Sequence, residues 1–308
     1  MADHAAFPDA VRSMATGCLE LSATDRAIDG IFKDAGRYIA AASAAAMSTG
    51  VTLAGLKRLC AKFGMLSPGR AAAMLLYLRY LGYMSLWRER PASGAARYRL
   101  SPTFKAAWQA HLCVVLHAAG LIEPAARQVP PRLDEPAFFD CFCRLHLDCL
   151  AESMPYWDPD MAFARVFLNR HAGTQIGWTL LVQQGDGAFP HPGPLEVCKA
   201  ALARRFGVSL MHVKRLFAQA KREGLIRQDD EHQLFLTELA RDQIRFLYAG
   251  QLVQLLMASA RTLAVMAPRS ELRQISAVPI GLKRESGPQD VRFRASGRPR
   301  AAKPRNGP

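Results

Sequence analysis

Residues 202–209 read LARRFGVS and have a counterpart in residues 59–64, LCAKFG. In each copy a short apolar helical face is followed by glycine, the residue that best tolerates the left-handed conformation just past a helix end. A serine comes soon after, Ser67 in the first copy and Ser209 in the second, and serine is a preferred N-cap residue. Each stretch therefore predicts a helix, a tight turn and a second helix.

The similarity between the two copies extends beyond these stretches. Three more anchors occur in the same order in both copies, namely 35–39 with 172–176, 82–83 with 224–225, and 98–101 with 234–237. After each second helix, two short extended segments surround a polar tip, RERPASGAA at 88–96 and DDEH at 229–232. The sequence thus predicts an internal repeat of helix, turn, helix and β-hairpin.

Helix, glycine turn, helix and β-hairpin is the plan of a winged helix-turn-helix domain. LARRFGVS, together with KREGLI at 221–226 and the strand that closes into Leu-Thr or Leu-Ser, resembles the bacterial MarR-like winged-helix regulators. The resemblance covers roughly residues 51–104 and 194–240. It implies a mainly α protein with small β-wings, whose terminal helices make a dimer interface. MarR-like proteins carry one copy and dimerise, so two copies in one chain imply a built-in pseudo-dimer.

The chain divides into four predicted segments. We expect a first winged-helix domain with flanking helices at 1–123 and a second one at 137–267. Four prolines, at 124, 130, 131 and 136, predict a linker at 124–136. Proline, glycine, serine and arginine dominate from residue 268 onward, so we expect a disordered basic tail at 268–308.

The charge of the chain points to a polyanionic partner. The formal net charge is +14 and the isoelectric point about 9.9. Residues 51–100 hold nine Lys or Arg and one Glu, and residues 269–308 hold ten Lys or Arg and three acids. Because the positive charge is concentrated in patches, double-stranded DNA is the expected partner. The alternative is a basic surface that is merely solvated.

The second copy carries the residues that we expect to read DNA. In a helix-turn-helix the second helix enters the major groove, and its early residues meet base edges. These residues and their neighbours on that helix are Met211, His212, Lys214, Arg215, Gln219, Lys221 and Arg222. Arg215 can pair with guanine and Gln219 with adenine. On the preceding helix, the cations expected over the phosphates are Lys199, Arg204 and Arg205.

The first copy is expected to act through its wing. Its second helix offers Arg70 but is otherwise rich in alanine and apolar residues. Its wing has Arg88, Arg90 and Arg97 around a Gly/Ser tip, whereas the tip of the second wing is acidic at 229–231 and would be repelled by phosphates. We therefore hypothesise that the second copy reads sequence and the first grips the backbone.

The tail contains a short motif of its own. Residues 297–300 (GRPR) resemble the AT-hook, in which an Arg-Pro core lies in the narrow A·T minor groove. The resemblance implies that Arg298 and Arg300 enter that groove. A plain basic tail is the alternative, and it also binds DNA.

Other sites have weaker support in the sequence. Cys143, His146 and Cys149 share a helical face and could form a metal or redox site, but buried thiols of this kind are common in protein cores. We therefore expect no metal and no cofactor. The seven cysteines and the absence of a secretory signal pattern favour reduced thiols in a cytoplasm. No nucleotide-binding, hydrolase or metalloprotease motif occurs, so an enzyme is not expected.

These observations lead to one predicted function and its rivals. The chain is expected to be a sequence-specific double-stranded DNA-binding transcriptional regulator, cytoplasmic and associated with the nucleoid. It would act as a monomeric pseudo-dimer or as a homodimer, with no membrane contact. A plasmid or phage replication initiator and a nucleoid-architectural protein are rivals of the same class. A protein-interaction scaffold is the rival from another class, supported by the apolar second helix of the first copy.

Overall fold

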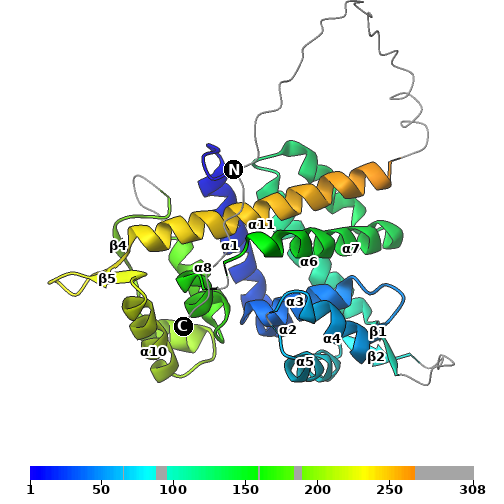
Figure 1. The fold of residues 1–308 in the computed structure, drawn as a ribbon, viewed down its shortest axis with the longest axis horizontal. Coiled ribbons are helices and arrows are strands. Elements are labelled where there is room, and N and C mark those ends of the chain that lie inside the picture. Colours follow the sequence, from blue (N-terminus) through cyan, green and yellow to red (C-terminus); the bar gives the residue numbers. More distant parts are fainter. Residues whose placement is uncertain (65, 88–95, 159, 184–188, 268–308) are drawn as a thin grey trace, which may run out of the picture. The chain divides into compact units, whose positions relative to one another are not determined.

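The computed structural model describes residues 1–64, 66–87, 96–158, 160–183 and 189–267. The chain within 1–266 forms one compact unit (Figure 1). The predicted disorder of the tail at 268–308 and the tip of the first wing at 88–95 lie outside the described residues. The described part is mainly helical and contains two small three-stranded antiparallel sheets.

The first half of the unit runs from the N-terminus to α6. Its elements are α1 (Phe7–Thr24), α2 (Arg26–Ile31), α3 (Ala35–Ala45), β1 (Val51–Thr52), α4 (Leu53–Ala61), α5 (Pro68–Tyr80), β2 (Met84–Leu86), β3 (Arg97–Leu100) and α6 (Pro102–Ala119). The three strands form a sheet in the order β1-β3-β2. Helices α4 and α5, with the β2–β3 hairpin, match the helix, turn, helix and hairpin predicted from the sequence.

The second half repeats this order. Its elements are α7 (Pro136–Ser153), the 3-10 helix η3 (Met154–Tyr156), the π-helix η4 (Ala164–Leu168), α8 (Gly173–Leu181), β4 (Pro194–Leu195), α9 (Lys199–Arg205), α10 (Leu210–Arg222), β5 (Ile226–Gln228), β6 (Leu234–Leu236) and α11 (Glu238–Val265). Its sheet has the order β4-β6-β5. The strands β1 and β4 were not predicted. Each is an edge strand of its sheet and precedes α4 or α9 in the chain.

The glycine turns and helix caps have the same geometry in both halves. Gly64 and Gly207 take φ values of 63° and 64°, in the left-handed region. The Ser67 hydroxyl accepts a hydrogen bond from the backbone N–H of Arg70, and Ser209 accepts one from His212. Because these interactions involve only neighbouring residues, the short stretches quoted above were sufficient to predict both turns.

The pattern of buried residues shows that the duplication spans nearly the whole unit. Each buried residue of α5 has a buried counterpart 142 positions later in α10, pairing Ala71 with Val213, Met74 with Leu216, Leu75 with Phe217 and Leu78 with Ala220. Six buried residues of α1 recur 128 positions later in α7, pairing Ala10 with Phe138, Val11 with Phe139, Met14 with Phe142, Ala15 with Cys143, Cys18 with His146 and Leu19 with Leu147. The first and seventh helices are therefore equivalent, although their side chains differ.

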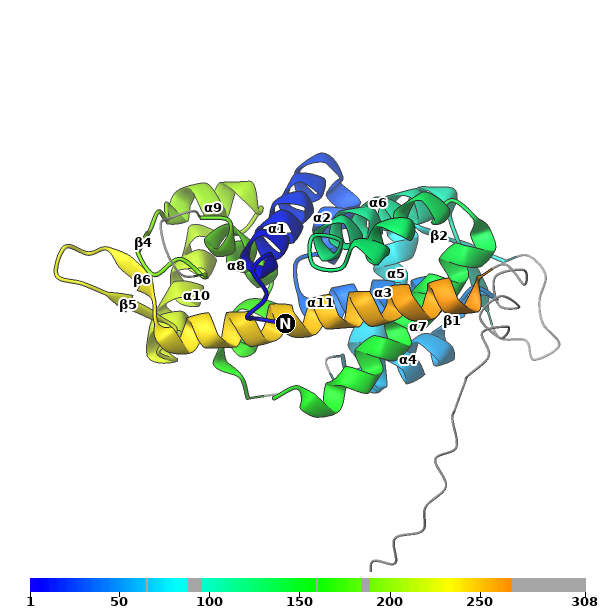
Figure 2. The same cartoon turned by 90° about the horizontal axis from the view of Figure 1, so that it is seen from above.

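The first helix of each half packs against both halves. Within each half the first helix packs on the last, α1 on α6 and α7 on α11. Across the halves, α1 also packs on α8, and α7 packs on α3, which is the counterpart of α8. Figure 2 shows α11 running alongside α7 through the length of the unit. These reciprocal contacts join both halves into one continuous core.

The proline-rich stretch belongs to this core and does not form a free linker. It is folded as two 3-10 helices, η1 (Pro124–Gln128) and η2 (Pro130–Arg132), in which proline occupies the first turn. Val129 is fully buried and Leu133 is 1% exposed. The prolines thus shape short helices here, which corrects the expectation of a linker between two separate domains.

Candidate nucleic-acid interface

Helix α10 places its apolar residues in the core and its cations outside. Val213, Leu216, Phe217 and Ala220 are buried. The side chains on the opposite side that are exposed include Met211, Lys214, Arg215, Lys221 and Arg222. Such a strongly two-sided helix, capped by Ser209, offers a dense row of positive charge to solvent.

Four of the predicted DNA-reading side chains are hydrogen-bonded within the protein. The ammonium of Lys221 donates to the side-chain oxygen of Gln228. The ring Nε2 of His212 is 2.7 Å from the carbonyl oxygen of His171. The amide of Gln219 donates to Glu223 at 2.7 Å, and Arg222 donates to the Gln219 oxygen at 2.7 Å. Lys214 and Arg215 have no hydrogen-bond partner among the described residues, so they are the side chains of this helix most available to a ligand.

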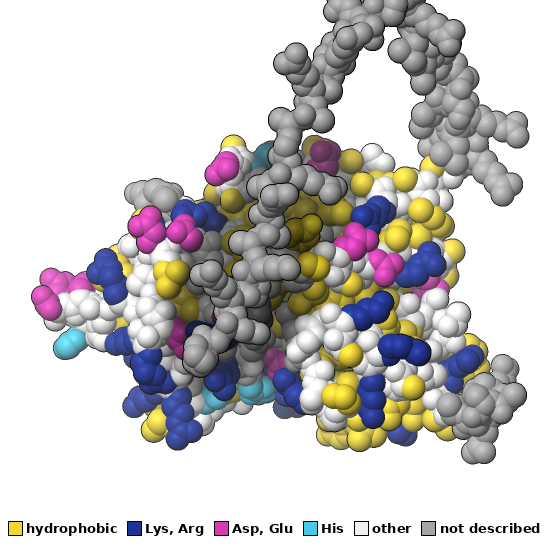
Figure 3. Space-filling view, in the orientation of Figure 1, with side chains coloured by type: hydrophobic (Ala, Val, Ile, Leu, Met, Phe, Trp, Pro, Cys, Tyr) yellow, Lys and Arg dark blue, Asp and Glu magenta, His cyan; other side chains and the backbone are white. Residues whose placement is uncertain are grey.

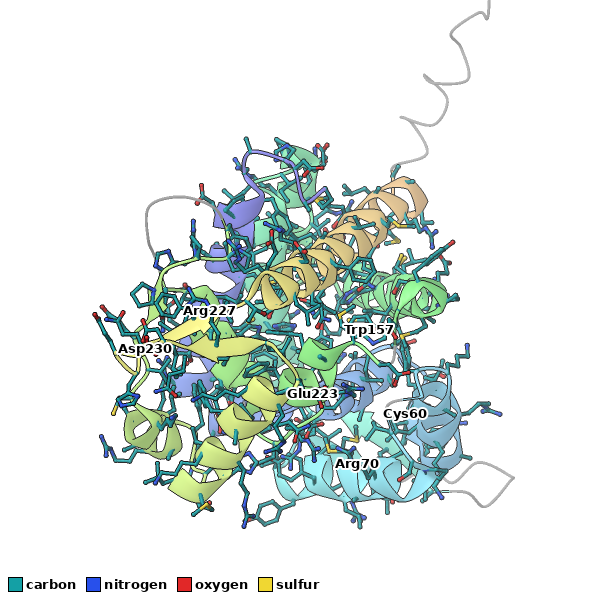
Figure 4. The ribbon with its side chains drawn as sticks, turned by 60° about the vertical axis from the view of Figure 1, so that its left-hand side comes forward. Cys60, Arg70, Trp157, Glu223, Arg227 and Asp230 are labelled. Carbon is teal, nitrogen blue, oxygen red and sulfur yellow. The ribbon has the colours of Figure 1, made fainter. Side chains whose placement is uncertain are left out.

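The C-terminal end of α10 is fastened to the π-helix η4. Glu223 forms an ion pair with Arg165 of η4, and α10 packs directly on that segment. Figure 4 shows Glu223 at this junction. The orientation of α10 therefore depends on the chain between α7 and α8.

Helix α9 presents two of its three predicted cations. Arg204 and Arg205 are exposed near the turn. Lys199 is partly buried, and its ammonium lies 5.7 Å from the centre of the Phe217 ring, which is a cation–π distance. Lys199 therefore contributes to packing as well as to surface charge.

The second wing has a cationic residue on its strands and an acidic tip. The Asp229 carboxylate accepts the backbone N–H of Gln233 at 2.8 Å and so shapes the turn. Asp230 and Glu231 are exposed at the tip, where Figure 4 labels Asp230. Arg227 lies nearer the body of the wing, with its guanidinium 4.0 Å from the Phe235 ring centre. The sequence analysis missed Arg227. The available signal was its position in the predicted hairpin, where it pairs with Phe235 of the other strand.

Helix α5 differs from α10 at equivalent positions. Where α10 has Lys214 and Arg215, α5 has Ala72 and Ala73. The guanidinium of Arg70 is 3.3 Å from the carboxylate of Asp34, so this predicted DNA contact is paired within the protein. The exposed side chains that remain on α5 include two large apolar ones, Leu76 at 60% and Tyr80 at 86% exposure.

The base of the first wing is a stack of aromatic and cationic side chains. The guanidinium groups of Arg97 and Arg99 lie 5.9 Å and 5.1 Å from the centre of the Trp87 ring. Arg99 is exposed and was not among the predicted residues. Arg88 and Arg90 lie outside the described residues, as do Arg298 and Arg300 of the tail.

The second helices of the two halves, α5 and α10, share one side of the unit. Figure 1 places α5 and α10 along the lower edge of the view, with the hairpins pointing outward at opposite ends. In Figure 3 lysine and arginine side chains gather along this edge, over α10 and over the first half, and the acidic tip projects at the far left. Helices α5 and α10 therefore face the same direction, and the exposed cations of this side include the row on α10.

The cysteine and histidine side chains named in the sequence analysis are part of the core. Cys143, His146 and Cys149 lie on the buried side of α7. In the part of the chain that the structure describes, no three His, Cys, Asp or Glu side chains come together as metal ligands. Burial lowers the pKa of His146 to about 4.

Comparison of the chain with protein-family models, with curated proteins and with solved structures gave no match in any of the three. Across the residues described, no helix is both long and apolar enough to cross a membrane.

Proposed function

We propose that the protein is a sequence-specific double-stranded DNA-binding regulator of transcription that uses two tandem winged helices of the MarR-like kind. Each β-α-α-β-β unit is interpreted as one winged helix-turn-helix, with α5 and α10 as second helices and the hairpins as wings. The two units form a pseudo-dimer within one chain. The protein acts by binding rather than by catalysis, in the cytoplasm and at the nucleoid.

The observation that carries this proposal is the exposed cationic row on α10. Lys214 and Arg215 come early in a capped second helix, the position from which such helices reach base edges. Arg204 and Arg205, on the helix before it, are suited to the phosphates on either side of the groove.

The difference between the two second helices supports a division of labour. The alanines at 72 and 73 cannot make the bidentate contacts that distinguish bases. Arg97 and Arg99, stacked beside Trp87, are suited to backbone phosphates instead. The second half is thus proposed to read sequence, and the first half to hold the neighbouring backbone.

Selection from a random duplex library tests the proposal. The full chain, and residues 1–267 without the tail, are each equilibrated with the library at physiological salt, and bound duplexes are sequenced. Recovery of a fixed motif by both proteins is expected. Recovery of no motif by either protein contradicts sequence-specific binding, and A·T-rich recovery by the full chain alone transfers the function to the tail.

A protein-interaction scaffold is a second candidate, and α5 supports it. Leu76 and Tyr80, four residues apart on an exposed helical face, form an apolar pair of the kind found at helix-in-groove contacts. The same library experiment separates the two functions, because a scaffold recovers no motif.

A further inference from the structure

The duplication produces two equivalent positions in the core, and only one of them is filled. The first is surrounded by Tyr38 of α3, by Phe63 after α4 and by Leu150 of α7. The pseudo-equivalent position is surrounded by Gln175, Phe206 and Ser22, which follow from the offsets of 137, 143 and 128 residues between matching segments.

The second position is closed by side chains of the protein itself. The Lys33 ammonium donates to the Phe206 carbonyl oxygen at 2.9 Å and pairs with the Asp29 carboxylate at 2.8 Å. The Gln175 amide donates to Asp29 at 2.6 Å and to the Ser22 hydroxyl at 3.3 Å. Lys33 is 6% exposed, so this cluster fills the space between the halves.

The first position has no such filling. The residue equivalent to Lys33 is Arg170, which is exposed to solvent. A cavity of about 130 Å³ remains at this position. Both halves contribute its largely aromatic and aliphatic lining, which includes Met14, Phe32, Ile39, Val115, Leu168 and Trp178. An engineered cavity of about 150 Å³ accommodates benzene, so the space suits one aromatic ring.

Some polar side chains of the lining have no hydrogen-bond partner among the described residues. They include the hydroxyl of Thr174 and the ring of His146, which lies on α7. His146 is 5% exposed and has no hydrogen-bond partner among the described residues, whereas His111 is hydrogen-bonded to Tyr38 at 3.3 Å. An unpaired buried ring nitrogen is costly, and a ligand that bonds to it removes that cost.

The charges of the lining exclude an ionic ligand. Asp34 is the one carboxylate in the lining, and it is paired with Arg37 at 3.2 Å and with Arg70 at 3.3 Å. A charged ligand would therefore enter an apolar space without a free counter-charge, at a high desolvation cost. The partly exposed residues of the lining include Ser153, Met154 and Trp157, and Figure 4 labels Trp157.

We propose that this cavity is a binding site for one small, uncharged, single-ring aromatic molecule bearing a hydroxyl or similar polar group that hydrogen-bonds to His146. The ring packs beside the edge-to-face pair of Phe32 and Trp178, and the polar group lies against α7. Each chain has one such site, since Lys33 closes the equivalent position. The proposal does not depend on DNA binding.

Tryptophan fluorescence of the full chain tests the site directly. Two of the four tryptophans, Trp157 and Trp178, line the cavity, so a bound ring changes their emission. Phenol and benzyl alcohol are the neutral polar probes, toluene lacks the polar group, and benzoate carries a charge. Saturable binding of phenol and benzyl alcohol with a rise in melting temperature is expected. Toluene should bind roughly threefold to tenfold more weakly than phenol, because one hydrogen bond is missing, and benzoate should not bind.

Two variants and a matched control locate the binding. His146→Leu should bring phenol down to the affinity of toluene. Leu150→Phe fills the cavity and should abolish binding. Ser22→Ala, at the position equivalent to Leu150 in the closed site, should leave binding unchanged. No saturable response to phenol or benzyl alcohol, or an unchanged response in Leu150→Phe, overturns the proposal. Should Leu150→Phe not fold, the comparison of the four probes on the natural chain still decides.

Discussion

Lys214 and Arg215 are the outward residues that distinguish α10 from its counterpart α5. The equivalent residues Ala72 and Ala73 stand on a helix with the same cap and the same buried side. The scaffold is thus identical, and the outward side chains alone differ. A residue that makes no contact inside the protein can change with little effect on stability, so the difference is best measured through binding.

Arg215→Ala is expected to reduce sequence discrimination. The loss on the preferred duplex should be about 1–3 kcal/mol, because a bidentate contact with guanine disappears. Binding to a scrambled duplex should change little. Arg204→Ala, on α9, is the control and should weaken both duplexes alike. Titration of both duplexes by fluorescence anisotropy measures the ratio, and an equal effect of Arg215→Ala on both contradicts its role as a reader.

The buried histidines should make stability fall in acid. Burial lowers the pKa of His111 to about 3 and that of His146 to about 4, from an ordinary value of 6.5. At a pH between 6.5 and the lowered pKa of each histidine, the unfolded chain binds a proton there that the folded chain does not. Lower pH therefore favours unfolding. Above pH 6.5 neither histidine affects stability. Below it, each should remove up to about 1.4 kcal/mol per pH unit until its folded pKa is reached.

Urea unfolding at pH 7.5, 6 and 5 measures this loss. His146→Leu should reduce the dependence on pH, since one of the two groups no longer titrates. The same pH dependence in the variant as in the natural chain would show that His146 is not the group responsible.

At the scale of elements, the turns between paired helices depend on glycine for a backbone reason. An added Cβ at Gly207 or Gly64 would meet no atom within 4 Å, so a substitution there causes no clash. Gly207→Ala and Gly64→Ala should nevertheless each cost about 1–2 kcal/mol, because φ is positive. Gly69→Ala, inside α5 and equally uncrowded, should instead stabilise by up to about 1 kcal/mol. Thermal unfolding distinguishes these signs, and a neutral Gly207→Ala would contradict the turn geometry.

The acidic tip of the second wing should limit affinity without affecting specificity. Asp230 is exposed on the hairpin. Asp230→Lys should tighten binding to all duplexes and steepen the salt dependence, adding about 1–2 to the slope of log K against log salt. Asp9→Lys, in the first turn of α1, makes the same change in net charge and is the control. Figure 1 shows the N-terminus at the top of the view, away from α10. Equal effects of the two substitutions would show that net charge alone is responsible.

Local interactions explain which elements could be predicted from the sequence. A glycine turn, a serine cap and a hairpin each depend on residues a few positions apart, so both copies were found. Helices α1 and α7 share buried positions but few residue types, as with Ala10 and Phe138, and their equivalence emerges only from burial. The strands β1 and β4 have two residues each, too few for a pattern.

The candidate interface could be predicted in outline but not in detail. Helical periodicity identified the outward side of α10, including Arg215. It could not show that the ring of His212 is hydrogen-bonded to the carbonyl oxygen of His171, because His171 is 41 residues earlier in the chain. The pairing of Arg70 with Asp34 was hidden for the same reason. Packing between distant segments determines which cations remain free.

At the scale of the whole molecule, one chain should occupy one DNA site. Both second helices belong to the same unit, so a second chain is not required to complete the pair. We expect one chain per duplex, with protected regions about one helical turn apart. Sedimentation of the complex with the selected duplex measures the ratio, and two chains per duplex would contradict a self-sufficient pseudo-dimer.

Because α1 and α7 each pack against both halves, the two halves can change independently in sequence but cannot separate. In an assembly of two identical chains every substitution occurs twice, so both halves must tolerate it together. Here a substitution occurs once, and Lys33 could close one position while its counterpart stayed open. The halves also cannot separate on dilution, because the chain and the shared core join them. Occupancy of a target should therefore rise with the first power of the protein's abundance rather than with its square.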